Sequence, residues 1–175
     1  MVEALAVRQG IRIRSRESGA RVGRGTVAGV STILALPQTY MNASGDAVVA
    51  LCQSNGIDPS EVCVVFDEVD LPLGALRIRP RGSGGTHNGM RSVVARVGME
   101  IPRLRVGVRG ERYSRERDLA DYVLDPFSRS EREAFEESVE RAAETLCVWL
   151  SDGIDAAMRI ANPKTSSPDG ASRPD

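Results

Sequence analysis

Residues 64–93 read VVFDEVDLPLGALRIRPRGSGGTHNGMRSV, and this stretch decides the class of fold. The β-branched and aromatic run at residues 62–66 predicts a buried strand, and three acids follow it within residues 67–70. Apolar residues alternate with arginines in residues 74–80, which predicts a second strand, and residues 87–97 then have helical spacing. Strands that alternate with helices predict an α/β sheet, and such sheets bind ligands at the carboxyl ends of their strands.

The loop between this second strand and the helix, residues 81–89, is rich in glycine and contains the chain's only histidine, His87. Glycines let the backbone approach a ligand closely, and a helix that begins at such a loop directs free N–H groups at an anion. The arginines around the loop, whose forked donors fit phosphate oxygens, are Arg77, Arg79, Arg81 and Arg91. The same composition suits an exposed hairpin loop with ordinary surface arginines. The loop lacks both the Walker A ending and the G-x-G-x-x-G spacing, which disfavours a nucleotide cofactor.

The rest of the chain continues the alternation of strands and helices. In chain order we predict an uncapped helix within residues 1–10, a short strand within 11–30, a buried strand over 30–37, a helix ended by Asn55 and Gly56, a half-buried strand near a sheet edge over 101–108, a polar connection over 111–127, a helix over 128–150 with a Ser128–Glu131 capping box, and a final helix over 154–161. The predicted fold is one α/β domain over residues 1–161, a twisted mixed β-sheet flanked by helices, followed by a disordered tail at residues 162–175.

The basic residues are unevenly distributed along the chain. Lysine and arginine together number 23 against 24 acidic residues, and the formal net charge is -1. Residues 77–117 nevertheless contain eleven arginines. A basic centre in a neutral protein indicates a bounded site for an anionic ligand rather than non-specific coating of nucleic acid. The alternative is that these arginines only form ion pairs with neighbouring acids on exposed faces.

The cysteines and the hydropathy indicate a soluble cytoplasmic protein. Cys52, Cys63 and Cys147 lie far apart in apolar contexts, which predicts buried thiols of a reducing compartment. No apolar run is long enough to span a membrane, and the N-terminus has no signal-peptide hydrophobic region. One histidine and three scattered cysteines supply no ligand set, so we expect no bound metal.

Four polar residues could carry chemistry at the predicted sheet edge. Asp67 follows one strand, Asn42 follows another, and His87 and Asn88 begin the helix after the glycine-rich loop. This arrangement suits acyl transfer, with Asp67 in an orienting or charged role and the asparagines holding a carbonyl or a ribose hydroxyl. His87 is the only imidazole base available, although a histidine among glycines is as often bonded to the backbone. No G-x-S-x-G elbow supports a serine nucleophile.

Five segments follow one another in a fixed order within about residues 2–162. They are PQTYMNASG at 37–45, VVFDEVDLPLGALRIRPRGSGGTHNGMRSV at 64–93, IPRLRVGV at 101–108, DYVLDPF at 121–127 and WLSDGIDAAM at 149–158. This series resembles bacterial peptidyl-tRNA hydrolase. The resemblance implies a monomeric α/β enzyme that needs no cofactor. It would hydrolyse the ester between the peptide and the 3′ end of tRNA in peptidyl-tRNA and so recycle the tRNA.

The resemblance also implies roles for individual residues. Asp67 matches the aspartate that polarises the family's catalytic histidine. The residues that match positions in or beside the family's substrate cleft are Met41, Asn42, His87 and Asn88. Arg79 and Arg105 stand where the family has basic residues that contact tRNA phosphate, in agreement with the local excess of arginine.

One part of the family's pattern has no counterpart in this sequence. The family begins with a strand, a glycine-asparagine-proline turn, a tyrosine, and a threonine-arginine-histidine-asparagine segment that supplies the catalytic base. The sequence begins instead within the following helix, in agreement with the uncapped helix of residues 1–10. We therefore expect a sheet whose first strand is missing, a base that His87 does not replace, and a chain with little activity of its own. An in-frame continuation upstream of the Met1 codon would support this expectation.

Two other interpretations stay open. A non-catalytic RNA-binding relative would keep the cleft and the arginines, and would bind tRNA in a salt-dependent manner without hydrolysing it. A generic anion-binding α/β domain would explain the loop at residues 81–89 but not the ordered series of segments.

Overall fold

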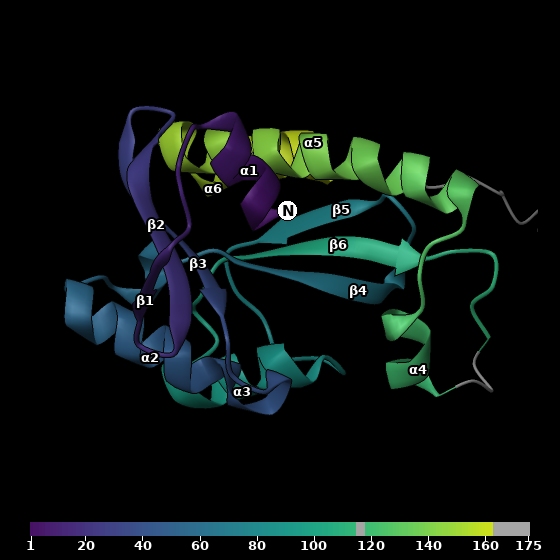
Figure 1. Cartoon of the computed structure of the whole chain (residues 1–175), viewed down its shortest axis with the longest axis horizontal. Coiled ribbons are helices and arrows are strands. Elements are labelled where there is room, and N and C mark those ends of the chain that lie inside the picture. Colours follow the sequence, from purple (N-terminus) through teal and green to yellow (C-terminus); the bar gives the residue numbers. More distant parts are fainter. Residues whose placement is uncertain (115–117, 163–175) are drawn as a thin grey trace, which may run out of the picture.

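The computed structural model describes residues 1–114 and 118–162 (Figure 1). In chain order the helices and strands are α1 (Val2–Arg8), β1 (Ser15–Glu17), β2 (Ala20–Val27), β3 (Val30–Pro37), α2 (Ser44–Asn55), β4 (Val64–Pro72), β5 (Leu76–Arg79), α3 (Asn88–Val97), β6 (Arg103–Arg109), α4 (Leu119–Leu124), α5 (Arg129–Asp152) and α6 (Ile154–Ala161). Two short 3-10 turns, Met41–Ala43 and Pro59–Glu61, precede α2 and β4.

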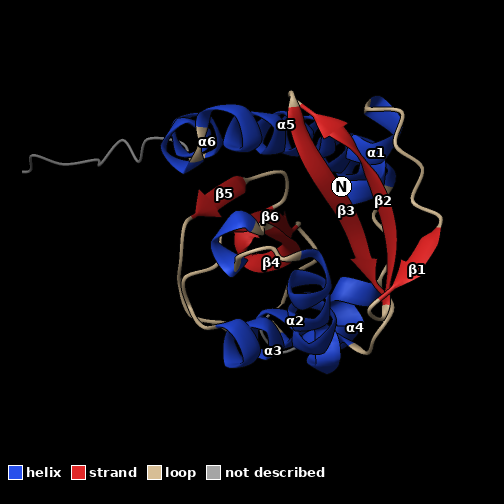
Figure 2. Ribbon diagram, turned by 90° about the vertical axis from the view of Figure 1, so that its left-hand side faces the viewer, coloured by secondary structure: helices blue, strands red, loops and turns tan. Residues whose placement is uncertain are grey.

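The strands of the described residues form two separate sheets (Figure 2). β1, β2 and β3 make an antiparallel sheet in which β3 is an edge strand. β4, β6 and β5 make a mixed sheet, where β4 runs parallel to β6 and β5 runs antiparallel to it. The α/β class predicted from the sequence is confirmed. The strands divide between two sheets where the sequence pattern placed them in one, because β3 and β4 do not pair with each other.

Helices cover both faces of the β4-β6-β5 sheet (Figure 1). On the side of α1, α5 and α6, the buried core includes Leu5, Leu76, Ile78, Leu104, Val106 and Leu146. On the side of α2 and α3, Met90, Val93 and Ile101 form a second buried cluster. Burial of each such large apolar side chain contributes about 1.5–3 kcal/mol. The sheet is therefore fixed from both sides, and it holds the residues at its rim in place.

β6 is the central strand of its sheet, so the predicted position near a sheet edge was wrong. The alternation of arginine with apolar residues indicated that one face of the strand is in water. Arg103 is instead only 3% exposed. Its guanidinium donates to the carbonyl oxygens of Ser83, Met99 and Ile101, at 2.7, 2.9 and 3.2 Å respectively. A buried arginine is tolerated when its donors are matched in this way.

Several predicted helix ends are confirmed. Ser128 and Glu131 form the capping box of α5, and the helix ends at Gly153. Gly56 ends α2 in the left-handed conformation, with φ of 63°. Met1 makes no side-chain cap for α1, as predicted. A good N-cap is worth about 1 kcal/mol, so α5 is well defined at the end that faces the site described below.

Two segments differ from the prediction. Residues 111–127 were predicted as a polar connection, but they contain α4, which is too short to show a helical period in the sequence. Asn162 was placed in the predicted tail of residues 162–175, yet its side-chain amide bonds the backbone N–H and C=O of Ile78 at 2.9 and 3.0 Å. The folded domain therefore includes Asn162, and the rest of that predicted tail lies outside the described residues.

Candidate active site

Asp67 lies within β4 rather than after its end. β4 continues to Pro72, so the predicted acids Asp67, Glu68 and Asp70 all belong to it. The parallel pairing of β4 with β6 shifts register between Glu68 and Pro72. Such an irregularity changes the direction of successive side chains. The side chain of Asp67 is 40% exposed, whereas Glu68 is buried.

His87 is the N-cap residue of α3 and faces Asp67. Its Nε2 lies 3.3 Å from Oδ1 of Asp67. The ring centroid lies 4.8 Å from that of Phe66, the residue before Asp67 on β4. The glycine-rich loop therefore brings the histidine to the carboxylate across a distance of 20 residues in the sequence.

The hydrogen bonds of His87 fix which ring nitrogen carries the proton. The backbone N–H of Met90 donates to Nδ1 at 3.0 Å, so Nδ1 is the unprotonated nitrogen. Nε2 then carries the proton and donates it towards Asp67. No free lone pair remains on the ring, so His87 in this arrangement cannot accept a proton from water. The sequence left open whether this histidine is a base or is bonded to the backbone, and the structure favours the second.

The pKa of the Asp67 carboxyl is held below its usual value. The hydrogen bond from His87 is the main cause, and partial burial opposes it. Asp67 is therefore ionised at neutral pH. Because Oδ1 meets His87 and the side chain is partly exposed, the other carboxylate oxygen can accept a hydrogen bond from a further group.

Met41 lies beside His87 because of a glycine. A Cβ at Gly89 would lie 2.5 Å from the Met41 sulfur and 2.9 Å from Cε1 of His87, so only glycine leaves room for both side chains. A second close approach occurs at Gly45, where a Cβ would overlap the backbone carbonyl of Ser92. Gly45 N–H also donates to the Ser92 hydroxyl at 3.0 Å. These contacts hold the 3-10 turn and α2 against α3.

Asn42 and Asn88 lie on these two packed elements. Asn42 is in the 3-10 turn Met41–Ala43, and Asn88 is the first residue of α3. Both residues are exposed, so their amide groups are available to a ligand. The structure brings their elements together on the side of Asp67 where Met41 and His87 meet.

An apolar groove of about 660 Å³ begins at this cluster and runs between β3 and β4. Met41, Asp67 and His87 are among its lining residues. The other lining side chains are mostly apolar and come from both strands and from the helices on either side. Glu61 is the only further lining residue with an acidic or basic side chain among those that the structure describes.

The two arginines predicted to contact phosphate lie near each other on the β4-β6-β5 sheet. Arg105 pairs with Arg77 and Arg79 with Arg103 across β5 and β6, which places all four on the same face. The Arg105 side chain is 29% exposed, and it bonds Glu68 at 2.7 and 2.8 Å. Its charge is therefore already matched, whereas Arg79 lies half-buried at the end of β5.

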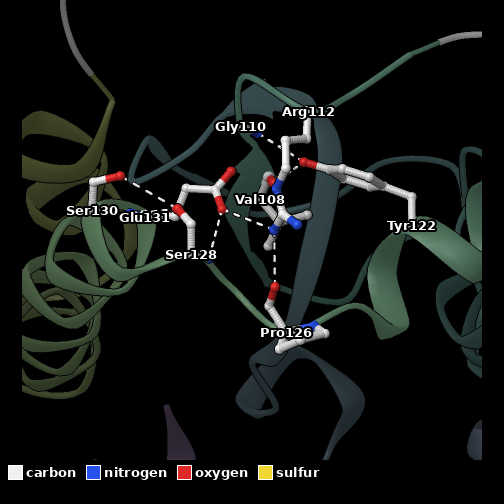
Figure 3. A network of polar contacts seen from close by, with 8 residues as sticks. All are labelled: Val108, Gly110, Arg112, Tyr122, Pro126, Ser128, Ser130 and Glu131. Atoms are coloured by element: carbon white, nitrogen blue, oxygen red, sulfur yellow. Dashed lines mark hydrogen bonds and ion pairs between the residues drawn. The ribbon is translucent and has the colours of Figure 1, made fainter.

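A polar network forms one wall of a small cavity that Asp67 also lines (Figure 3). The Tyr122 hydroxyl of α4 donates to the Val108 carbonyl at 2.9 Å and accepts the Gly110 N–H at 2.8 Å. Arg112 donates to Glu131 at 3.0 Å, and Glu131 also accepts the N–H of Ser128. This network ties α4 to the end of β6 and to the start of α5.

Sequence reasoning missed this wall. Glu131 was identified only as a helix cap, and Tyr122 only as part of a segment of the family resemblance. Asp67, Arg112, Tyr122 and Glu131 all line a small cavity of about 40 Å³. The bond from Ser128 is the main cause that holds the pKa of the Glu131 carboxyl below its usual value. Glu131 is therefore ionised at neutral pH and can hold Arg112.

The part of the chain that the structure describes contains neither a metal site nor a membrane-spanning helix. Within residues 1–114 and 118–162, no group of three or more histidine, cysteine, aspartate or glutamate side chains is placed to hold a metal ion. No helix in this part of the chain is both long and apolar enough to cross a membrane.

Comparison with known proteins identifies the family. A family model described as peptidyl-tRNA hydrolase matches residues 1–169. The chain belongs to the peptidyl-tRNA hydrolase family. The peptidyl-tRNA hydrolase of Chloroflexus aurantiacus is 47% identical over 164 residues, which are 93% of this chain and 86% of the relative. That of Roseiflexus castenholzii is 46% identical over 171 residues, or 97% of this chain and 79% of the relative.

A solved structure supports the same assignment. The crystal structure of peptidyl-tRNA hydrolase from Acinetobacter baumannii matches with a TM-score of 0.84 and 32% identity, over 93% of this chain and 82% of that one. The family resemblance inferred from the sequence is confirmed, and the members of this peptidyl-tRNA hydrolase family are enzymes. The roles of individual residues stay predictions, and the geometry above is what supports them.

Proposed function

We propose that this member of the peptidyl-tRNA hydrolase family hydrolyses the ester that joins a peptide to tRNA, with Asp67 at the centre of the site. One observation carries the proposal. Asp67 is an ionised carboxylate at the mouth of a large apolar groove, in contact with His87 and close to Met41. An apolar groove that ends at a few convergent polar groups is the usual form of a small-ligand site.

Ester hydrolysis requires a base to take a proton from water and donors to stabilise the oxyanion. Asp67 is a weak base because its pKa is lowered, but its charge suits it to orient an imidazole and to stabilise it when protonated. Asn42 and Asn88 supply exposed amide donors for the carbonyl oxygen. No cofactor or metal is needed for this chemistry.

The imidazole that takes the proton from water is not His87, because its Nε2 donates towards Asp67 and its Nδ1 accepts the N–H of Met90. His87 is also the only histidine of residues 1–175. We therefore propose that the catalytic base comes from a segment outside these residues, and that residues 1–175 alone bind substrate but hydrolyse it slowly. The free oxygen of Asp67 is where such a base would bond.

The tRNA part of the substrate would lie across the arginine-bearing face of the sheet. Arg79 is the better candidate for a phosphate contact, since Glu68 already neutralises Arg105. Arg105 would still contact a phosphate if its guanidinium bound Glu68 and the phosphate at the same time. We further propose that the protein acts as a monomer in the cytoplasm.

A release assay on N-acetylaminoacyl-tRNA tests the proposal, with the Chloroflexus aurantiacus relative as the standard. We expect residues 1–175 to bind the substrate and to release the peptide at least about 10²-fold more slowly than the relative, since general-base catalysis contributes 10²–10⁴-fold. Turnover by residues 1–175 equal to that of the relative would contradict the missing base. An absence of binding would contradict the substrate assignment.

The second candidate function is RNA binding without hydrolysis. The observation in its favour is the fully engaged ring of His87, which leaves the described residues without a free imidazole. The two functions separate when the amino-terminal residues of the Chloroflexus aurantiacus relative are joined ahead of Met1. Recovery of hydrolysis supports the enzyme, whereas tight, salt-dependent binding with no hydrolysis supports the RNA-binding protein.

A further inference from the structure

A second concentration of arginine lies outside the segments that form the candidate site. Residues 8–24 contain six arginines and a single acid, Glu17. Three of these arginines are exposed and make no ion pair with any residue that the structure describes, and they are Arg12, Arg14 and Arg16. We call these three residues the arginine row. The function proposed above makes no use of them.

The acids nearest to the arginine row in the sequence are already bound by other side chains. Glu3 pairs with Arg21 at 3.9 Å. Glu17 pairs with Arg24 at 2.5 Å and accepts the side-chain amide of Asn55 at 2.7 Å. Residues 1–30 contain no other acid. The arginine row is therefore a local excess of positive charge on a protein whose net charge is -1.

The backbone that carries the arginine row is fixed against β2. The side chains of Ile11 and Ile13 are buried in the core, while the arginines that alternate with them are exposed. A Cβ at Gly23 would lie 2.9 Å from the carbonyl oxygen of Arg12, so glycine lets this segment lie directly on β2. Arg21 also donates to the Ile13 carbonyl at 3.1 Å. The row is thus held in place before any partner binds, which lowers the entropic cost of binding.

One member of the row is placed where it lowers the stability of the sheet. Arg16 of β1 lies directly opposite Arg21 of β2. Like charges at directly opposite positions destabilise a sheet. Glu3 offsets little of this repulsion, because it lies 3.9 Å from Arg21 and both side chains are largely in water. An anion bound at the row would remove the repulsion.

The hairpin that carries Arg16 contacts the segment that leads into the candidate site (Figure 2). The N–H of Gln38 donates to the carbonyl of Gly19 at 2.8 Å, and a Cβ at Gly19 would lie 3.5 Å from Thr39. Residues 38–39 continue into the 3-10 turn Met41–Ala43. In Figure 2, β1 and β5 lie on opposite sides of the molecule, with β4 between them. The arginine row and the face that bears Arg79 therefore flank the strand of Asp67.

The chemistry of the arginine row fits the phosphate backbone of RNA. Forked arginine donors match phosphate oxygens. Residues 11–17 expose no aromatic or large aliphatic side chain. Such side chains anchor most protein interfaces and membrane-binding helices, which makes a protein or a lipid surface a poorer fit. Contacts to phosphate carry no base information, so a row of this kind would accept tRNAs of different sequence.

We propose that the arginine row binds the phosphate backbone of the tRNA body, the part of the tRNA beyond its 3′ end, as a second contact besides that of Arg79. The inference rests on the proposed function, because it takes the tRNA of the substrate as the polyanion. The candidate site would hold the 3′ end, and the row would hold a part of the tRNA that does not enter the groove.

The test replaces Arg12, Arg14 and Arg16 together by glutamine in residues 1–175. The matched control has the same change of charge at three exposed arginines of α5 and α6, which make no ion pair among the described residues: Arg129→Gln, Arg132→Gln and Arg159→Gln. Fluorescence anisotropy measures binding over a range of salt concentrations to two probes. One is full-length tRNA, and the other is a short single strand with the sequence of the tRNA 3′ end.

We expect the row variant to lose about 2 units from the slope of log K against log salt on full-length tRNA, because each lost phosphate contact removes about 0.7–0.9. Its affinity for tRNA should fall about tenfold or more, and its affinity for the short strand should stay within about twofold of the unchanged protein. The control should lose less slope than one contact supplies. Urea midpoints should show that both variants are folded, and that of the row variant should not fall, since Arg16→Gln removes the repulsion of Arg21.

Four results would overturn the proposal. An unchanged slope in the row variant would mean that these arginines contact no phosphate. Equal losses in the row variant and the control would assign the effect to overall charge. An equal loss on the short strand would place the arginines at the 3′ end instead of the tRNA body. Self-association of the unchanged protein by sedimentation, lost in the row variant, would make a second copy the partner.

The two probes also separate this inference from the proposed function. Loss of tRNA binding in the row variant, with no binding of the short strand by the unchanged protein, would contradict the candidate site and support the row. Binding of both probes by the unchanged protein, with no effect of the row variant, would support the site and overturn the row. Binding of neither probe would overturn both.

Discussion

At the scale of the residue, His87 has a structural task that can be separated from any chemical one. Its Nδ1 accepts the N–H of Met90 and so caps α3. Replacement of an N-cap side chain by alanine costs about 1 kcal/mol. We therefore expect His87→Ala to lower the free energy of unfolding by about 1 kcal/mol in urea titrations. His87→Asn is the control, because asparagine caps well, and it should keep most of the stability. Equal losses in both variants would contradict the capping role.

Asp67 gives a prediction for the dependence of stability on pH. The folded-state pKa of this carboxyl is lowered, chiefly by the bond from His87. Its contribution to stability is therefore complete above the pKa of the unfolded chain, about 3.9, and is lost as pH falls through the lower folded value. Asp67→Asn removes this contribution. The difference in unfolding free energy between the two proteins should shrink between about pH 5 and pH 2, as urea titrations across this range would measure. A difference in unfolding free energy that stays constant with pH would show that the bond from His87 does not stabilise the ionised Asp67.

At the scale of the element, α4 depends on one hydroxyl group. The Tyr122 hydroxyl bonds both the carbonyl of Val108 and the N–H of Gly110, and so joins α4 to the end of β6 (Figure 3). Tyr122→Phe would leave both backbone groups without this partner, at a cost of about 1–3 kcal/mol. Hydrogen exchange at residues 119–124 should accelerate and the urea midpoint should fall. Tyr113→Phe is the matched control, because Tyr113 packs edge-on against the Tyr122 ring at 5.2 Å. Similar effects of the two changes would show that the loss is not specific to the bonds of the Tyr122 hydroxyl.

The elements also show which features a sequence can predict. The capping box of α5 and the glycine end of α2 were predicted correctly because they depend on residues a few positions apart. The central place of β6 was missed because Arg103 is satisfied by carbonyls of Ser83 and Met99, which no local pattern reveals. In the site, the sequence predicted that Asp67 and the glycine-rich loop with His87 lie close together at the sheet edge, and the two side chains are in contact. The tautomer of His87 depends on the N–H of Met90 and could come only from the structure.

At the scale of the whole molecule, the contribution of Arg105 to stability must be separated from any contribution to tRNA binding. Removal of Arg105 would leave Glu68, whose side chain is only 10% exposed, without its partner at 2.7 Å. Arg105→Ala should therefore lower the free energy of unfolding by about 1–3 kcal/mol, besides any effect on tRNA. Arg132→Ala on the exposed surface of α5 is the control and should stay within about 0.5 kcal/mol. A loss of tRNA affinity in Arg105→Ala counts as a binding effect only at temperatures where the variant is fully folded.

Arg79 gives the cleaner test of tRNA recognition by the molecule as a whole. The net charge is only -1, so binding to tRNA has to rely on local arginines rather than on an overall positive field. Each phosphate contact that is lost lowers the slope of log K against log salt by about 0.7–0.9. Arg79→Ala should weaken tRNA binding and reduce this slope by about that amount, and adding Arg105→Ala should reduce it further. Filter binding between low and physiological salt measures both quantities, and hydrolysis of small ester substrates by a chain that carries the base should change less. A slope that stays the same in both variants, or equal losses on tRNA and small esters, would place the phosphate contacts elsewhere.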